Sequence, residues 1–567
     1  MRYWNALVFC RDRLVLGEWQ TISLDDVSQH LECTRRNAQL LIKRLVKEQV
    51  IEWQSGVGRG NLPKAKLLCS LSERLKGYAH RLLEQEQVEA AVSLVPESER
   101  ELFLKTYLSR YQSTQQAKDI LQVPFYRATH ALDPITINRR TELHIASYLY
   151  ASLLKYDASS GEFIGDLAHH WQRDDDGVTV ILRKGLTFHD GSALTAASIK
   201  AHFERLIHKA TNHRAMFQFI DEVKVETPLK LKFVSHRLPH LVPKLLAHSA
   251  MGVTKFDQGR VIGSGAFVLA EQTQWRTLLL VNTDYHGHRP WIDGVEIWNL
   301  GENAKEIALN CDFVHSRHMA EKANTPLESH QQWERGCVHA MLNPARHPWM
   351  KRKRHRRVLQ QLLLAMGQPK SAQVETLARA SGMMSQPECI QESDLTSLKS
   401  ALASLPEPGD ELRIVTYQLF THVNTVRLIE MSLKRLGIPC RTTVLEFPVF
   451  NSVETLREAD IIVTGEVFTE DIEMSWLGWL LGTASNEACF SDERKAWLLE
   501  QTVKTMNRPD LKRKLQGFEA IESKLIKEGI YQPLYHVEQE MNVSKKVSAP
   551  ELLANGWIDF NRVVLNV

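Results

Sequence analysis

The sequence predicts a multidomain α/β protein, with a small helical module at the N-terminus and a larger two-lobed α/β domain behind it. Three observations predict this fold class. Two short amphipathic helices and a glycine-rich hairpin fill residues 23–69. A mixed texture of strands and helices begins near Val123. Residues 406–410 (PEPGD) then interrupt the chain before a β-α-β pattern that indicates a second lobe.

The first of the two N-terminal helices is expected to begin after Ser23, a favourable N-cap, with apolar residues on one face. Thr34 can cap the second helix, over residues 35–47. At about 100° per residue, this second helix separates an apolar face from a polar one. The apolar face carries Ala38, Leu41, Ile42 and Leu45, and the polar face carries Arg35, Arg36, Gln39 and Lys43.

A basic hairpin follows these helices. Residues 50–54 alternate as a strand, glycines surround Arg59 in a flexible turn, and residues 64–69 can return as a second strand. Helix, turn, helix and basic hairpin is the order of a winged helix-turn-helix. In that fold an exposed helix reads base edges in the major groove, and wing cations meet phosphates. The predicted DNA-binding residues are Thr34, Arg35, Arg36, Asn37, Gln39, Lys43, Arg59 and Lys64.

The charge balance places this basic character in the N-terminal module. The 567-residue chain has a net charge of only +3, whereas residues 1–70 hold 11 Lys or Arg and 7 Asp or Glu, a net charge of +4. Nucleic-acid binding must therefore be local. The competing interpretation is a winged helix that contacts only proteins, with its charges as a solvated face.

Composition indicates a reduced, cytoplasmic setting. The eight cysteines are far apart, and none has metal-ligand spacing with its neighbours, so we expect no metal and no cofactor. Arg11–Asp12–Arg13 interrupts the apolar N-terminal run where an export signal would continue, and no stretch has the length of a membrane span.

The helical stretch after the wing allows two interpretations. A helix is predicted over residues 72–95 and another over residues 99–111, and they form either a spacer or a dimer surface. We therefore divide the chain into a winged helix-turn-helix (1–70), a helical linker (71–117) and a two-lobed ligand-sensing domain (118–567). In the last, strands at 412–417, 442–446 and 461–463 flank a helix over 424–436, and a cleft between lobes would suit a small ligand.

No catalytic set is evident. The sequence shows no Ser/His/Asp arrangement, carboxylate pair or phosphate loop in a supporting context, and the glycine runs at residues 56–60 and 263–265 lack a strand-to-helix setting. His189, before Asp190–Gly191, reads as a packed turn histidine. We expect a protein that is not an enzyme.

A series of motifs resembles the family 5 bacterial extracellular solute-binding proteins, the oligopeptide- and dipeptide-binding type. It comprises residues 132–134 (LDP), 150–154 (YASLL), 166–168 (DLA), 182–185 (LRKG), 188–191 (FHDG), 262–267 (IGSGAF) and 290–295 (PWIDGV). This resemblance implies a two-lobed periplasmic-binding-protein-like fold.

The same resemblance implies where a ligand binds. It aligns residues 460–480 with part of the solute cavity, so that Phe468, Glu470, Asp471 and Trp476 become ligand-binding candidates. The family's Trp is replaced and its Tyr is absent here, which favours a small ligand such as a sugar or sugar phosphate over a peptide. Trp476 and Trp479 are either core residues or cavity walls.

The basic run Lys351–Arg357 opens a predicted helix. It is either a solvated helix start or a site for an anionic ligand or DNA backbone.

A winged helix joined to a solute-binding domain, without an export signal, resembles the SgrR family of bacterial transcriptional regulators, which are associated with sugar-phosphate stress. The resemblance implies a cytoplasmic regulator that binds double-stranded DNA and a small molecule, with RNA polymerase and a second copy of the chain as further partners. The alternative is a solute-binding protein of an ABC transport system, of the peptide or oligosaccharide type.

Overall fold

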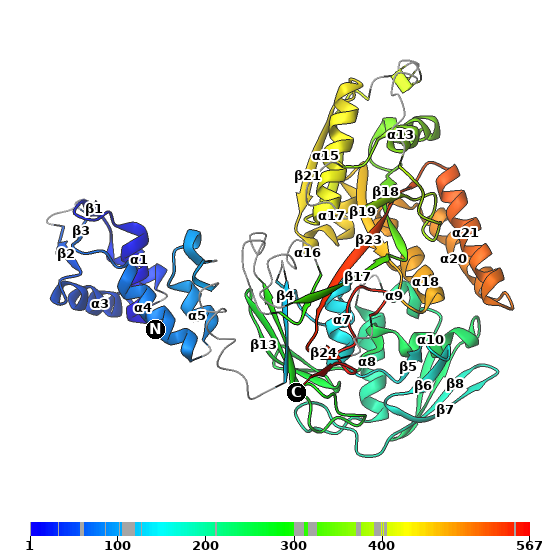
Figure 1. Ribbon diagram of the computed structural model, residues 1–567, viewed down its shortest axis with the longest axis horizontal. Helices are drawn as coiled ribbons and strands as arrows, with labels where there is room; N and C mark the ends of the chain where they lie inside the picture. The colour runs from blue at the N-terminus through cyan, green and yellow to red at the C-terminus, as the bar shows by residue number, and fades with distance from the viewer. Residues whose placement is uncertain are drawn as a thin grey trace.

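The computed structural model describes most of the chain. The described residues are 2–31, 33–56, 62–85, 87–100, 102–104, 119–125, 128–209, 213–299, 311–315, 326–369, 376–390, 398–399, 401, 405–406, 408–548 and 552–566. Within them, a small N-terminal module precedes a larger α/β domain of two lobes, as predicted (Figure 1).

The N-terminal module is a helix-turn-helix with a small sheet. Ser23 forms a capping box with Asp26 at the start of the second helix, as its sequence position predicts. The sheet has three strands in the order β1-β3-β2, one more than the predicted hairpin, because Trp19–Thr21 pairs with Lys64–Lys66. The elements are α1 (Arg2–Arg13), β1 (Trp19–Thr21), α2 (Leu24–His30), α3 (Arg35–Lys47), β2 (Ile51–Gln54) and β3 (Lys64–Leu67).

The segment after the wing packs on the same core. The prediction of a single helix over 72–95 is wrong. The stretch forms two helices, α4 (Ser72–Glu84) and α5 (Val88–Ser93), followed by η1 (Glu97–Glu99). The break turns the chain so that both helices bury apolar side chains, including Leu75, Leu83 and Val92, against α1 and α3. This apolar cluster extends to Trp298, Cys311 and Val314 of the large domain. The limits at residues 70 and 117 stay a prediction.

The first lobe begins with a four-stranded sheet in the order β13-β14-β15-β4. The chain's C-terminal segment completes its core, where Trp557 stacks on His144 with ring centroids 4.9 Å apart. The elements are β4 (Ile120–Phe125), α7 (Arg140–Leu149), β13 (Phe267–Gln272), β14 (Arg276–Val281), β15 (Gly294–Asn299), β24 (Val547–Ser548) and β25 (Val564–Leu565).

A second sheet, in the order β7-β8-β10-β9, completes the first lobe. His189 lies in a turn beside it, with Nε2 3.2 Å from the Gly265 carbonyl oxygen, and burial lowers its pKa. The elements are β5 (Leu154–Asp157), β6 (Glu162–Gly165), β7 (Ala168–Asp174), β8 (Gly177–Leu182), α8 (Ala196–His208), α9 (Arg214–Phe217), β9 (Glu222–Thr227), β10 (Lys230–Val234), η2 (Pro239–Leu241), α10 (Val242–Ala247), η3 (Ser249–Met251), β11 (Lys255–Asp257) and β12 (Arg260–Ile262).

The second lobe is built on one large sheet, in the order β16-β23-β18-β22-β20-β21, with β17 and β19 also paired to β23. Strand 412–417 has the predicted bounds, whereas α15 begins four residues before the predicted Asn424. The strands are β16 (Phe313–Val314), β17 (Leu327–Trp333), β18 (Gly336–Leu342), β19 (Thr376–Arg379), β20 (Leu412–Tyr417), β21 (Cys440–Leu445), β22 (Ile461–Val467) and β23 (Tyr531–Ser544).

Helices cover this sheet on both faces (Figure 1). They are α12 (Pro348–Lys351), α13 (Lys353–Ala365), α15 (Phe420–Arg435), α16 (Phe447–Phe450), α17 (Val453–Arg457), α18 (Ile472–Gly482), α19 (Ala484–Cys489), α20 (Asp492–Met506) and α21 (Leu511–Lys527).

Strand β23 connects the two lobes. Leu534 and Tyr535 in its first half lie in the second-lobe core, whereas Met541 and Val543 near its end lie in the first-lobe core. The diagonal red arrow in Figure 1 shows this crossing. Because β23 is one continuous strand, it fixes the second lobe to the C-terminal segment of the first.

Candidate nucleic-acid interface and ligand-sensing region

Helix α3 is fixed at its start and along one face. The Thr34 Oγ1 accepts a hydrogen bond from the Asn37 N–H at 3.4 Å, as its N-cap position predicts. Ala38, Ile42 and Leu45 are buried in the module core. The remaining predicted contact residues of this helix, Arg35, Arg36, Asn37, Gln39 and Lys43, are exposed together with Thr34.

The exposed cations of α3 differ in whether they form ion pairs within the module. Arg35 Nε lies 3.6 Å from Asp25 Oδ1, in a solvent-exposed pair with α2. Arg44 Nε binds Glu48 Oε1 at 2.8 Å and is occupied within the module. In the described part of the chain, Arg36 and Lys43 have no ion-pair partner, so their charges face solvent.

The C-terminal end of α3 is tied to two other helices by a cluster that the sequence did not reveal. Tyr3 of α1 donates a hydrogen bond to the Glu48 carboxylate, and Arg74 of α4 binds the same carboxylate at 2.9 Å. The Tyr3 hydrogen bond and those from Arg44 and Arg74 lower the pKa of Glu48 to about 2. Burial, with the Glu48 hydrogen bond, raises the pKa of Tyr3 to about 12. The three helices are therefore fixed relative to one another.

The two described lysines of the wing differ in their contacts. Lys64 is exposed opposite Gln54 in the β2-β3 ladder. Lys66 lies 3.6 Å from Glu52 and over the Trp19 ring, so it is held on the sheet. The predicted contact Arg59 lies outside the described residues.

The four ligand-binding candidates are placed near one another, at the end of β22 and the start of α18. Phe468 and Trp476 are fully buried, 5.2 Å apart between ring centroids, and Trp476 stacks on Phe518. Glu470 accepts a hydrogen bond from the Ala554 N–H at 2.8 Å. Trp476 and Trp479 thus lie within the core, although their indole N–H groups have no hydrogen-bond partner in the described structure.

Asp471 joins the two lobes. Its carboxylate caps α18 and receives Lys244 Nζ of α10 at 3.0 Å. Both side chains are largely buried, at 14% and 13% exposure. His240 of the same lobe also reaches across, with Nε2 2.9 Å from the Met506 carbonyl oxygen. Each of these contacts bridges the lobes and would break if they separated.

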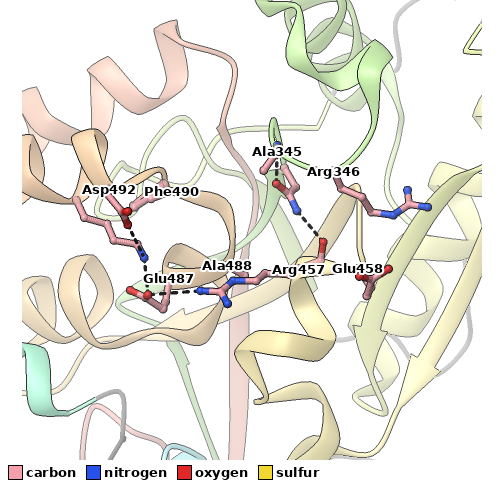
Figure 2. Close-up of a pocket in the computed structure, with 10 residues that line it drawn as sticks. Ala345, Arg346, Arg457, Glu458, Glu487, Ala488, Phe490 and Asp492 are labelled. Atoms are coloured by element: carbon pink, nitrogen blue, oxygen red, sulfur yellow. Dashed lines mark hydrogen bonds and ion pairs between the residues drawn. The ribbon is translucent and has the colours of Figure 1, made fainter.

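A separate hollow lies at the opposite end of β22 (Figure 2). It has a volume of about 340 Å³ and is lined by Asn343, Ala345, Arg346, Arg457, Glu458, Glu487, Ala488, Phe490, Asp492 and Lys495. Its cations are paired with carboxylates, since Lys495 binds Glu487, Arg457 lies 3.9 Å from Glu487 and Arg346 binds Asp460. These pairs leave little charge for an ionic ligand.

The basic run Lys351–Arg357 is only partly a solvated helix start. Arg356 is 6% exposed and donates to the carbonyl oxygens of Met350, Lys351, Glu528 and Gly529 at 2.6–3.0 Å. His355 is buried as well, with Nδ1 2.8 Å from the Trp349 carbonyl oxygen. Burial lowers the pKa of Arg356. The run therefore anchors α13 as well as presenting charge.

Among the described residues there is neither a membrane-spanning helix nor a metal-binding cluster. No helix within these ranges is both long and apolar enough to span a bilayer. In the same ranges, no three His, Cys, Asp or Glu side chains are grouped so that they could hold a metal ion.

Comparisons with known proteins agree with this architecture. Residues 9–117 match the family described as sugar transport-related sRNA regulator N-term, and residues 162–361 match bacterial extracellular solute-binding proteins, family 5 middle. The dipeptide binding protein from Pseudoalteromonas sp. SM9913, in complex with Met-Leu, is similar with a TM-score of 0.65 and 17% identity, covering 79% of this chain and all 100% of that chain. This likeness shows the two-lobed fold.

Curated relatives are named as transcriptional regulators. The HTH-type transcriptional regulator SgrR of Salmonella choleraesuis (strain SC-B67) is 29% identical over 336 residues, which span 58% of this chain and only 59% of that relative. The SgrR of Photorhabdus laumondii subsp. laumondii is 24% identical over 567 residues, covering 97% of this chain and 96% of that protein. Neither relative is named as an enzyme. The chain therefore carries a match to the SgrR N-terminal family followed by a match to the family 5 solute-binding proteins, and along almost its whole length it is similar to a protein named as the regulator SgrR.

Proposed function

We propose that this protein is a DNA-binding transcription regulator whose solute-binding domain senses a small molecule in the cytoplasm. The observation that carries the proposal is the outward face of α3, where Arg36, Gln39 and Lys43 are exposed on a helix whose other face is buried. Its relatives' names, and the module's place before a binding-protein fold, support the same function.

The chemistry of that face suits duplex DNA. An α-helix fits the major groove, where Arg can bind guanine O6 and N7 and Gln or Asn can bind adenine N6 and N7. Arg36, Asn37 and Gln39 supply those groups, and Lys43 can neutralise a phosphate. In this proposal Thr34 and Arg35 sit at the groove edge, while Lys64 and Arg59 of the wing contact the backbone beside it.

The first experiment measures binding of the full-length protein to a duplex from its own upstream region, with a shuffled duplex of equal composition as competitor. We expect the upstream duplex to bind about 10³-fold or more tightly, as specific sites do. The variant Arg36→Ala/Lys43→Ala should lose that preference. Equal binding to both duplexes by the wild type would refute the regulator function and favour the transport-type binding protein.

We further propose that the sensed molecule is a sugar or sugar phosphate, bound near Phe468–Trp476. Support comes from the name of the N-terminal family, which refers to sugar transport, and from the segment itself, where the Trp that the family 5 resemblance aligns is replaced and the Tyr is absent. A ligand acts only through different affinities for two states of the protein. The contacts Lys244–Asp471 and His240–Met506 join the two lobes, so they are the contacts that a change of lobe spacing would make or break.

This ligand assignment is tested by repeating the DNA titration with glucose, glucose 6-phosphate or a dipeptide present. We expect glucose or its phosphate to change DNA affinity about 5- to 150-fold, the usual range of allosteric coupling, and the dipeptide to change nothing. A response to the dipeptide alone would contradict the sugar assignment while leaving DNA binding intact.

The proposal extends to two partners. A regulator of this architecture would act through RNA polymerase at the promoter, and the 71–117 segment would supply a homodimer contact that lets two winged helices span two half-sites. Light scattering of the full chain on a one-half-site and a two-half-site duplex distinguishes a dimer from a monomer.

A further inference from the structure

A leucine lies on the exposed face of α3. Leu40 is 58% exposed, although it is one of the most apolar residues in the helix. At about 100° per residue, the buried Ala38, Ile42 and Leu45 lie roughly 140–200° around the helix axis from it. Leu40 therefore points directly away from the module core.

Three cations lie beside Leu40, along one side of it on the exposed face of α3. Arg36, Lys43 and Lys47 lie within about 60° of it around the axis, one turn before it and one and two turns after it. All three are exposed, and across the described ranges none of them has an ion-pair partner. A polyanion attracted to these cations would lie against Leu40 as well.

The position of Leu40, more than its exposure, is what requires an explanation. Single exposed leucines are common on protein surfaces and need none. Here, Arg44 lies about 40° from Leu40 on one side and is paired with Glu48, while Arg35, farther around the helix, is paired with Asp25. The unengaged Arg36, Lys43 and Lys47 line the other side of Leu40, and their charge suits nucleic acid as the occupant of this face.

We propose that Leu40 contacts the 5-methyl group of a thymine in the major groove and selects that base. This inference rests on the proposed DNA-binding function. The thymine methyl is the apolar group that a base pair presents in that groove. Leucine has no polar atom to pair with the exocyclic amine of cytosine or adenine, so those bases would be desolvated without compensation. Arg36 and Lys43 would hold the backbone or neighbouring bases while Leu40 reads the methyl.

The test replaces thymine by deoxyuridine, which removes the methyl group and changes no hydrogen-bonding atom. Full-length wild type is titrated against its preferred duplex, obtained by selection from a randomised duplex pool, with deoxyuridine substituted at one thymine at a time. We expect affinity to fall about three- to fivefold at one or two thymines, the value of one lost apolar methyl contact. Leu40→Ala should bind the thymine and deoxyuridine duplexes equally at those positions.

The matched control is Leu511→Ala, because Leu511 is 47% exposed on α21 of the second lobe, away from the N-terminal module. This variant should retain the wild-type deoxyuridine profile. Selection of a preferred duplex with no deoxyuridine effect, or with the same effect in Leu40→Ala, would overturn the proposal for Leu40 while supporting DNA binding. Failure to select any preferred duplex would overturn the DNA-binding function itself.

Discussion

Arg356 shows, at the scale of one residue, that a cation in a basic run can be a buried structural residue. In the sequence it is one of six cations in a run of seven residues, which left a solvated helix start and an anion site as the alternatives. In the structure its guanidinium is buried and donates to four backbone carbonyls, two of them at the turn that follows α21. Five donors in a rigid fork suit that role, and Lys could not replace it.

We expect Arg356→Met to lower the free energy of unfolding of the second lobe by about 2–4 kcal/mol, because several buried carbonyls lose their donor. Urea denaturation of the full chain, followed by tryptophan fluorescence, measures this. The control is Lys353→Met, since Lys353 is exposed in the same run. Losses of equal size in the two variants would contradict a structural role for Arg356.

Burial could not be inferred for single residues from the sequence. Trp476 was ambiguous between core and cavity wall, and only the three-dimensional contact with Phe518, a residue 42 positions later, places it in the core. The exposed face of α3 was predictable, because helical periodicity alone separates it from the buried face. That Arg35 is engaged by Asp25 while Arg36 is free depends on the packing angle of α2, which periodicity does not provide.

At the scale of elements, features that depend on local sequence were predicted correctly, whereas features that depend on tertiary contacts were not. The caps at Ser23 and Thr34 and the strand at 412–417 follow from local chemistry, and the structure confirms all three. The division of the helix over 72–95 depends on two apolar faces turning toward one core, which no local motif marks. Strand β1 is only three residues long and forms through pairing with a distant strand, so it was missed.

The Tyr3–Glu48–Arg74 cluster is the clearest element-scale prediction, since it joins α1, α3 and α4. Glu48 has a folded-state pKa of about 2, below the unfolded value of about 4.3. Its contribution is therefore complete above the unfolded pKa and is lost as the pH falls from about 4.3 toward 2. We expect Glu48→Gln to weaken these helix contacts by about 1 kcal/mol at pH 7, allowing for solvent screening.

Amide hydrogen exchange of α3 peptides in the full-length chain measures that loss. The wild-type advantage over Glu48→Gln should shrink as the pH is lowered through about 4. Glu52→Gln is the control, because Glu52 is exposed and its ion-pair partner Lys66 is 3.6 Å away. An advantage that stays constant from pH 7 to pH 3 would show that the charge of Glu48 does not hold the helices together.

At the scale of the whole molecule, charge and fold are divided between the two parts. Residues 1–70 carry a net charge of +4 and the remaining residues a net charge of −1, which together give the +3 of the chain, and the large domain has the two-lobed fold of solute-binding proteins. Ordered motifs in residues 132–295 were sufficient to predict that fold. The ligand-binding residues were less predictable, because Glu470 and Asp471 take partners from the C-terminal segment and the opposite lobe.

The central claim is that the face of α3 binds duplex DNA, and the salt dependence of binding tests it most directly. The slope of log affinity against log salt concentration counts the phosphates that the protein neutralises, at about 0.9 per contact. We predict a negative slope for the wild type on its upstream duplex, reduced in magnitude by about 1 in Arg36→Ala/Lys43→Ala, because Lys43 is the proposed phosphate contact of the pair. Lys504→Ala/Arg513→Ala, which removes two exposed cations of the second lobe, should retain the wild-type slope. An unchanged slope in the α3 variant, or a reduction only in the second-lobe variant, would contradict the assignment of α3 as the DNA-binding helix.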